Sequence, residues 1–137
     1  MCFQMRKEQV TFERIDGELI IISMDSGKYF SATGSAADVF YLIEKQTPLG
    51  SFKKILSSSF SSQVEQSEID ALIEIAIREG LVETCQEPSQ IDPELPLDYQ
   101  RSSWTTPNLI EFSDLQDLIL VDPVHDTSLK GWPVEKE

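Results

Sequence analysis

The sequence predicts an α+β fold: a three-stranded antiparallel meander, then three helices and a short strand, with an extended C-terminal tail. Residues 10–32 alternate in polarity or are β-branched, and glycine-containing turns interrupt them, as in consecutive strands. Residues 35–79 change to the helical spacing of apolar side chains. Beyond residue 85 the chain is rich in proline and acidic residues, which disfavours a second core.

The meander is expected to consist of three strands, at residues 10–15, 18–24 and 28–32. The first alternates along its length, and Asp16 with Gly17 supplies a tight turn because glycine tolerates positive φ. The second is β-branched and nearly continuous in apolar character, which predicts a strand covered on both faces.

The helices are delimited by capping and breaking residues. Ser35, with Asp38 three residues later, predicts the N-terminal cap of the first helix, and Pro48 the start of the second. Ser67 is expected to cap the third helix, which Gly80 ends. With a return strand at residues 81–84, this order describes a winged-helix-like domain with a hairpin in front.

The third predicted helix has a core stripe and one isoleucine outside it. The stripe consists of Ile69, Leu72, Ile73, Ala76 and Ile77. Ile75 falls beside Ala71 and Arg78 instead. Two interpretations stay open: Ile75 is an incidental surface residue, or these three side chains form one wall of a groove.

The charge of the chain argues against a nucleic-acid ligand. The formal net charge is -13; residues 1–85 carry 13 acidic and 8 basic side chains, and residues 86–137 carry 11 and 3. A nucleic-acid surface needs clustered Lys and Arg to neutralise phosphates. No apolar run reaches the roughly 20 residues that span a bilayer, and residues 1–8 do not resemble a secretory signal. We therefore expect a cytoplasmic protein without a membrane partner.

Catalysis, a metal and a cofactor are not expected. Cys2 and Cys85 do not define a disulfide framework, and a cytosolic setting would keep them reduced. Cys85, His125 and Asp126 could be drawn as a cysteine-protease-like set, but Cys85 lacks a glycine-rich elbow or helix N-terminus to lower its pKa. The cluster of Asp122, His125 and Asp126 is more typical of a solvated acidic tail than of a metal site.

Residues 8–84 resemble the PqqD family, also called the RiPP recognition element, which serves ribosomally synthesised and post-translationally modified peptides. The matching segments are residues 18–22, 26–30, 32–36, 39–43 and 79–82. The resemblance lies in their ordered pattern, since no single catalytic motif anchors it. It implies a non-catalytic domain that binds the leader region of a precursor peptide and delivers it to a modifying enzyme or a leader peptidase.

The resemblance also implies where the leader binds. The leader adds as a strand beside the third strand and packs against the third helix, so that main-chain hydrogen bonds give affinity and side-chain pockets give specificity. The groove is therefore expected between one wall of strand residues and one wall of helix residues, namely Lys28, Tyr29, Phe30, Ser31, Ala32, Ala71, Ile75 and Arg78. For Phe30, an ordinary core position remains the alternative.

The C-terminal part of the chain divides into an acidic, proline-rich linker at residues 86–100 and a tail at residues 101–137. In the tail, Trp104, Pro107 and Leu109 resemble the leader motif of lasso-type precursor peptides, in which an aromatic residue, a proline and a leucine have this spacing. Tryptophan replaces the usual tyrosine. No glycine-led product segment with a ring-closing acid follows.

Three interpretations of the tail remain open. Residues 104–109 occupy the groove of the same domain, or of a second copy through tail exchange, as a tethered pseudo-leader or a fused substrate. Alternatively, the segment from Leu115 to Trp132, which includes Leu118, docks on a partner enzyme. In the third interpretation, Trp104 and Trp132 complete the hydrophobic core. The competing function is a winged-helix interaction or transcription-type domain that binds no leader, and the negative charge disfavours it.

Overall fold

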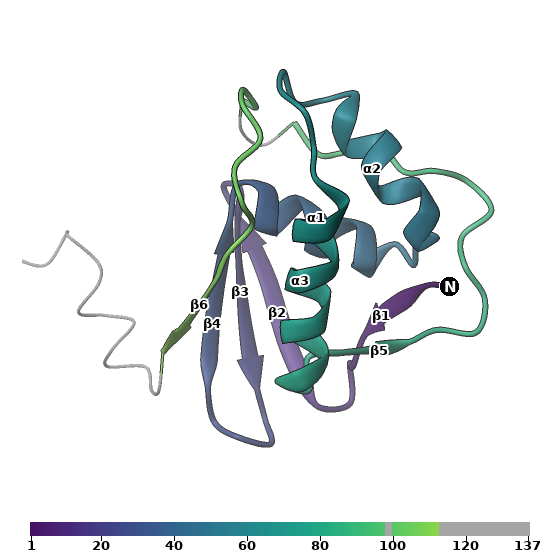
Figure 1. The fold of residues 1–137 in the computed structure, drawn as a ribbon. Coiled ribbons are helices and arrows are strands. Elements are labelled where there is room, and N and C mark those ends of the chain that lie inside the picture. Colours follow the sequence, from purple (N-terminus) through teal and green to yellow (C-terminus); the bar gives the residue numbers. More distant parts are fainter. Residues whose placement is uncertain (98–99, 113–137) are drawn as a thin grey trace, which may run out of the picture.

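The computed structural model describes residues 1–97 and 100–112. Its centre is a four-stranded antiparallel sheet in the order β2-β3-β4-β6 (Figure 1). The strands are β2 (Val10–Ile15), β3 (Glu18–Ser23), β4 (Tyr29–Thr33) and β6 (Leu109–Phe112). The first three form the predicted meander, and the fourth comes from the tail.

The meander buries one face, which corrects one expectation. On β3, Leu19 and Ile21 are fully buried, whereas Ile20 and Ile22 are only half-buried on the opposite face. The strand is therefore not covered on both faces by the residues that the structure describes. The cause is that the three helices lie on one side of the sheet (Figure 1).

Three helices follow the meander, as predicted: α1 (Ser35–Glu44), α2 (Leu49–Ser57) and α3 (Gln66–Arg78). Pro48 is the N-cap of α2, as its predicted place at the start of that helix requires, but the predicted serine caps of α1 and α3 are wrong. Gly34, at φ 59°, is the N-cap of α1, and Ser35 is its first helical residue. Glu65 is the N-cap of α3, and Ser67 lies inside that helix. Neither N-cap makes a side-chain capping hydrogen bond.

The stripe on α3 is confirmed except at its end. Ile69, Leu72, Ile73 and Ala76 are buried, whereas Ile77 is 45% exposed. At 100° per residue Ile77 lies at the edge of the stripe, so a small rotation of the helix leaves it in solvent.

The structure has a second sheet of two strands, and the N-terminal strand of this sheet was not predicted. β1 (Phe3–Met5) pairs antiparallel with β5 (Val82–Thr84), the short return strand. This register places Cys2 opposite Cys85, with Cα atoms 5.3 Å apart, and the two form a disulfide. The expectation of reduced cysteines is wrong for this structure, because spacing in the sequence gave no hint that the chain ends of the domain meet.

One hydrophobic core joins these elements. Its largest fully buried side chains include Phe40 from α1, Phe52 from α2 and Leu72 from α3, and Phe30 from β4 packs with them. Phe30 is thus a core residue. No helix in the described part of the chain is long and apolar enough to cross a membrane.

The segment expected to be a linker lies along the domain over residues 86–97. The Ser89 amide donates to the Gln46 carbonyl at 2.9 Å, Lys54 pairs with Asp92 at 2.9 Å, and Leu95 is buried in the core. It contains no helix or strand. Because of these contacts, residues 86–97 lie against the domain, and the chain returns towards the β4 edge of the sheet.

Candidate functional site

The tail adds a strand to the domain. β6 pairs antiparallel with β4, with Tyr29 opposite Phe112 and Ala32 opposite Leu109. In Figure 1, residues 100–112 run as a long extended segment at the β4 edge of the sheet and end in β6. The edge of β4 that the meander leaves unpaired is therefore occupied by residues of the same chain.

Side chains of β6 alternate between the two faces of the sheet. Leu109 lies opposite the buried Ala32 and packs against the hydrophobic core. Ile110 lies opposite Ser31 on the outer face and is 46% exposed. Leu109 is thus the inward contact of β6, whereas Ile110 contributes mainly main-chain pairing.

Trp104 anchors the tail upstream of β6. Its ring packs edge-on against Phe60 with 5.2 Å between centroids, and its side chain is almost fully buried. The indole Nε1–H donates to Glu68 Oε1 on α3 at 2.7 Å, and the Trp104 amide donates to Ser62 Oγ at 2.7 Å. The polar group of this large apolar side chain is therefore satisfied, as burial of a tryptophan requires.

Two further contacts hold the residues around Trp104. The Thr106 hydroxyl donates to the second carboxylate oxygen of Glu68 at 2.9 Å. The Ser35 hydroxyl, in the first turn of α1, donates to the Thr105 carbonyl at 2.8 Å. Pro107 is buried as well. The tail thus forms hydrogen bonds with side chains of α1 and α3 before it pairs with β4.

A buried ion pair precedes the tryptophan. Arg101 Nε and Nη2 bond to the two carboxylate oxygens of Asp38 at 2.8 and 2.7 Å. The side chains of Arg101 and Asp38 are 5% and 1% exposed. Charge-assisted, two-pronged pairs of this kind are among the strongest polar contacts in proteins.

The other end of the tail meets a surface lysine. Lys28 Nζ lies 3.3 Å from Glu111 on β6 and 3.5 Å from Glu79 at the end of α3. The hydrogen bond to Glu111 is the main cause that raises the pKa of Lys28 above its usual 10.5, and the charges of Glu111 and Glu79 add to it. The tail therefore runs beside α3, with Trp104 near Glu68 at its start and Glu111 near Glu79 at its end.

The structure places the sequence-predicted groove residues in different environments. The strand residues 28–32 all lie in or next to the strand that pairs with β6. Ile75 is half-buried and Arg78 is exposed, while Ala71 lines an apolar hollow with Phe3 and Ile77. Of the tail residues, Trp104, Pro107 and Leu109 reach the domain; Leu115 and Leu118 lie outside the described residues, as do Trp132 and the residues 122–126 of the acidic cluster.

Glu68, Glu79 and the pair of Asp38 with Arg101 were not predicted from the sequence. A signal for the first two exists: Glu68, Leu72, Ile75 and Glu79 are spaced by four, three and four residues, so they share one face of α3. Asp38 was interpreted as part of a helix cap instead. No local pattern shows that an arginine 63 residues later reaches it.

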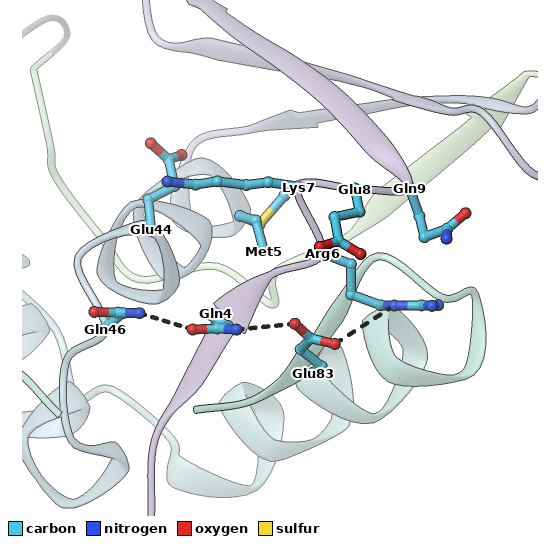
Figure 2. Close-up of a pocket in the computed structure, with 9 residues that line it drawn as sticks. All are labelled: Gln4, Met5, Arg6, Lys7, Glu8, Gln9, Glu44, Gln46 and Glu83. Atoms are coloured by element: carbon cyan, nitrogen blue, oxygen red, sulfur yellow. Dashed lines mark hydrogen bonds and ion pairs between the residues drawn. The ribbon is translucent and has the colours of Figure 1, made fainter. Parts of the chain in front are cut away.

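A polar hollow of about 340 Å³ lies elsewhere, between β1, β5 and the end of α1 (Figure 2). Figure 2 shows a row of hydrogen bonds and ion pairs across it, from Gln46 through Gln4 and Glu83 to Arg6. These side chains bond to one another and connect the two-stranded sheet to Gln46, just after the end of α1. In the part of the chain that the structure describes, no cluster of His, Cys, Asp and Glu could hold a metal ion.

Comparison with known proteins identifies a similar fold. No protein-family model matches the chain, and no curated protein matches it in sequence. A solved structure described as TbiB1 in complex with the TbiA(beta) leader peptide matches with a TM-score of 0.52. The match has 15% sequence identity and covers 61% of this chain and 99% of that one. At this identity the similarity concerns the fold.

Proposed function

We propose that this protein recognises the leader region of a ribosomally synthesised precursor peptide by adding it as a strand to β4 (Tyr29–Thr33), and presents it to a modifying enzyme or leader peptidase. The observation that carries the proposal is the pairing of β6 with β4 beside α3. In this pairing an extended segment of the same chain occupies the edge of β4 in an antiparallel register, which supports the proposal. Strand addition of this kind is a general mode of peptide recognition.

The comparison supports the same function. TbiB1, whose fold is similar, was solved with a leader peptide. The predicted groove residues Lys28, Ala32 and Ile75 belong in this proposal as parts of the peptide site, with Glu68 as an additional contact. The proposed role is binding, and the polar side chains along the tail serve it by holding the tail through hydrogen bonds and ion pairs.

We further propose that residues 101–112 are a tethered pseudo-leader. They belong to the same chain and occupy the edge that a leader would need. A short tether gives an effective concentration in the millimolar range, so a free leader must displace the tail. A fused substrate that is modified in place is the minor variant of this proposal.

The experiment compares leader binding to the intact protein and to a variant with a weakened tail. Leu109→Asp places a charge where Leu109 packs against the core, which should release β6. Fluorescence anisotropy measures binding of labelled leader peptides from precursor genes encoded beside this one. We expect apparent affinity to rise by about tenfold or more in Leu109→Asp, because the tether no longer competes.

Ile110→Thr is the matched control, since Ile110 is exposed and threonine keeps the strand propensity. It should leave leader affinity as in the unmodified chain. Absence of saturable binding to both the intact and the released protein would refute leader recognition. Equal affinity of the two would refute only the pseudo-leader.

A further inference from the structure

Asp38, in the first turn of α1, is the most deeply buried charged side chain along the tail. Its position suggests which residue a bound peptide must carry opposite it. We propose that Asp38 selects peptides with an arginine three residues before the aromatic anchor. This inference rests on the proposed function and adds a specificity-determining residue to it. The predicted leader motif begins only at the aromatic position.

The geometry matches a guanidinium group. Arg101 places Nε and Nη2 on separate carboxylate oxygens of Asp38, at 2.8 and 2.7 Å. A planar fork fits a carboxylate in this manner, whereas an ammonium group is a point charge on a flexible stem. Lysine at the same position would therefore replace the charge but not the two-pronged contact.

Burial makes the contact a condition for binding. The Asp38 side chain is 1% exposed, and its neighbours Ala37 and Val39 are buried too. A carboxylate in such a place loses its hydration when a peptide covers it, and removing the cation from a buried pair is strongly unfavourable. A leader that replaces the tail without bringing a cation would cover this carboxylate with no guanidinium beside it.

The spacing between the cation and the aromatic residue is set by the same turn of α1. Ser35 Oγ donates to the Thr105 carbonyl at 2.8 Å, one residue after Trp104. Asp38 lies three residues later in the same first turn of that helix and holds Arg101. Trp104 meanwhile reaches Phe60 and Glu68. These contacts fix the register of residues 101–105, so the arginine must stand three positions before the aromatic residue.

The test uses the full chain with a protease recognition sequence inserted between residues 97 and 100, since Leu97 is 95% exposed. After cleavage both fragments are present, and the tail fragment can exchange. Labelled synthetic peptides of residues 100–112 with Arg, Lys or Gln at position 101 are titrated by fluorescence anisotropy. We expect the Gln peptide to bind about 100-fold more weakly than the Arg peptide, with Lys between them.

Asp38→Asn in the same cleavable chain supplies the second measurement. It should reduce the preference for the Arg peptide over the Gln peptide to less than about fivefold, because the buried charge is gone. If this variant fails to fold, the three peptides on the unmodified domain still decide. An Arg peptide carrying Ile110→Thr is the control and should keep its affinity.

Binding of the Arg and Gln peptides within threefold of each other would overturn the inference and leave leader recognition standing. That result is expected if Arg101 stays docked while an incoming peptide replaces only residues 104–112. Failure of all three peptides to bind saturably would overturn both the inference and the proposed function.

Discussion

Two segments from outside the central meander and helices complete this domain by antiparallel pairing, and they are held in different ways. β1 pairs with β5 and carries the buried Phe3 and Met5. The disulfide from Cys2 closes it covalently. β6 pairs with β4, yet Ile110 and Glu111 on it are exposed.

The anchors of the second segment lie outside the strand itself. Trp104 and Arg101 are buried upstream of β6 and are held by Glu68 and Asp38. Such contacts form and break without covalent chemistry. β1 is thus held covalently and by its own buried side chains, whereas residues 101–112 are held by a few side chains and a strand ladder; under the proposed function they are attached as a ligand is.

The largest expected effect comes from removing the tryptophan anchor. Trp104→Ala deletes a buried ring that packs against Phe60, and such truncations cost about 3 kcal/mol or more. Docking of the tail should weaken by more than about 100-fold. Hydrogen exchange of the amides in residues 109–112 measures this directly.

The comparison with β1 supplies the control for that variant. Amides of β1 and β5 should keep their protection in Trp104→Ala, because the disulfide and Phe3 hold that sheet independently. Loss of protection in both sheets would contradict the distinction between a fixed and an exchangeable segment. It would favour the interpretation in which Trp104 simply completes the core.

The next effect concerns the covalent closure. Cys85→Ser opens a loop with a sequence separation of 83 residues, which should lower the free energy of unfolding by about 3 kcal/mol. Urea denaturation followed by circular dichroism measures it. Reduction of the unmodified protein is the matched control and should shift the denaturation curve equally. At urea concentrations below the unfolding transition, docking of the tail should be unchanged. Coincident curves for the oxidised and reduced protein would show that β1 is held by packing alone.

Much of the fold follows from local pattern. Alternation at residues 10–15 and the Asp16-Gly17 turn predicted β2 and its hairpin with β3, and apolar spacing predicted three helices. The serine caps were wrong because backbone geometry at Gly34, with positive φ, starts α1 without a side-chain cap. β1 was missed because three residues carry too little periodicity, and its pairing with β5 depends on contacts such as Gln4 opposite Glu83, far apart along the chain.

The site could be predicted only in part. The spacing of Trp104, Pro107 and Leu109 singled out the segment that reaches the domain, because these three residues lie close together in the sequence and can be recognised there. The partners on the domain depend on which face of each helix turns to the tail. The buried pair of Asp38 with Arg101 joins two segments that are distant in the sequence, so the local pattern around Asp38 predicts only a helix cap.

The smallest expected effect is at the far end of the tail, where Lys28 bridges Glu111 and Glu79. Lys28 and Glu111 are 38% and 42% exposed, so solvent and salt screen the pair, and Lys28→Gln should weaken docking by less than about threefold. The pKa of Lys28 is raised by the docked tail, mainly through the hydrogen bond to Glu111.

The raised pKa of Lys28 determines how docking of the tail depends on pH. Docking brings Glu111 beside Lys28 and so favours the protonated lysine. This contribution is fully present below the pKa that Lys28 has in the undocked domain, and it is lost as pH rises through the higher pKa of the docked state. Hydrogen exchange is too fast at that pH, so fluorescence of Trp104 in a Trp132→Phe background would follow docking between pH 9 and 12. The difference in docking between the unmodified chain and Lys28→Gln should vanish at the alkaline end, where neither lysine nor glutamine at position 28 carries a charge. A difference that persists there would mean that the lysine stem, rather than its charge, holds the end of β6.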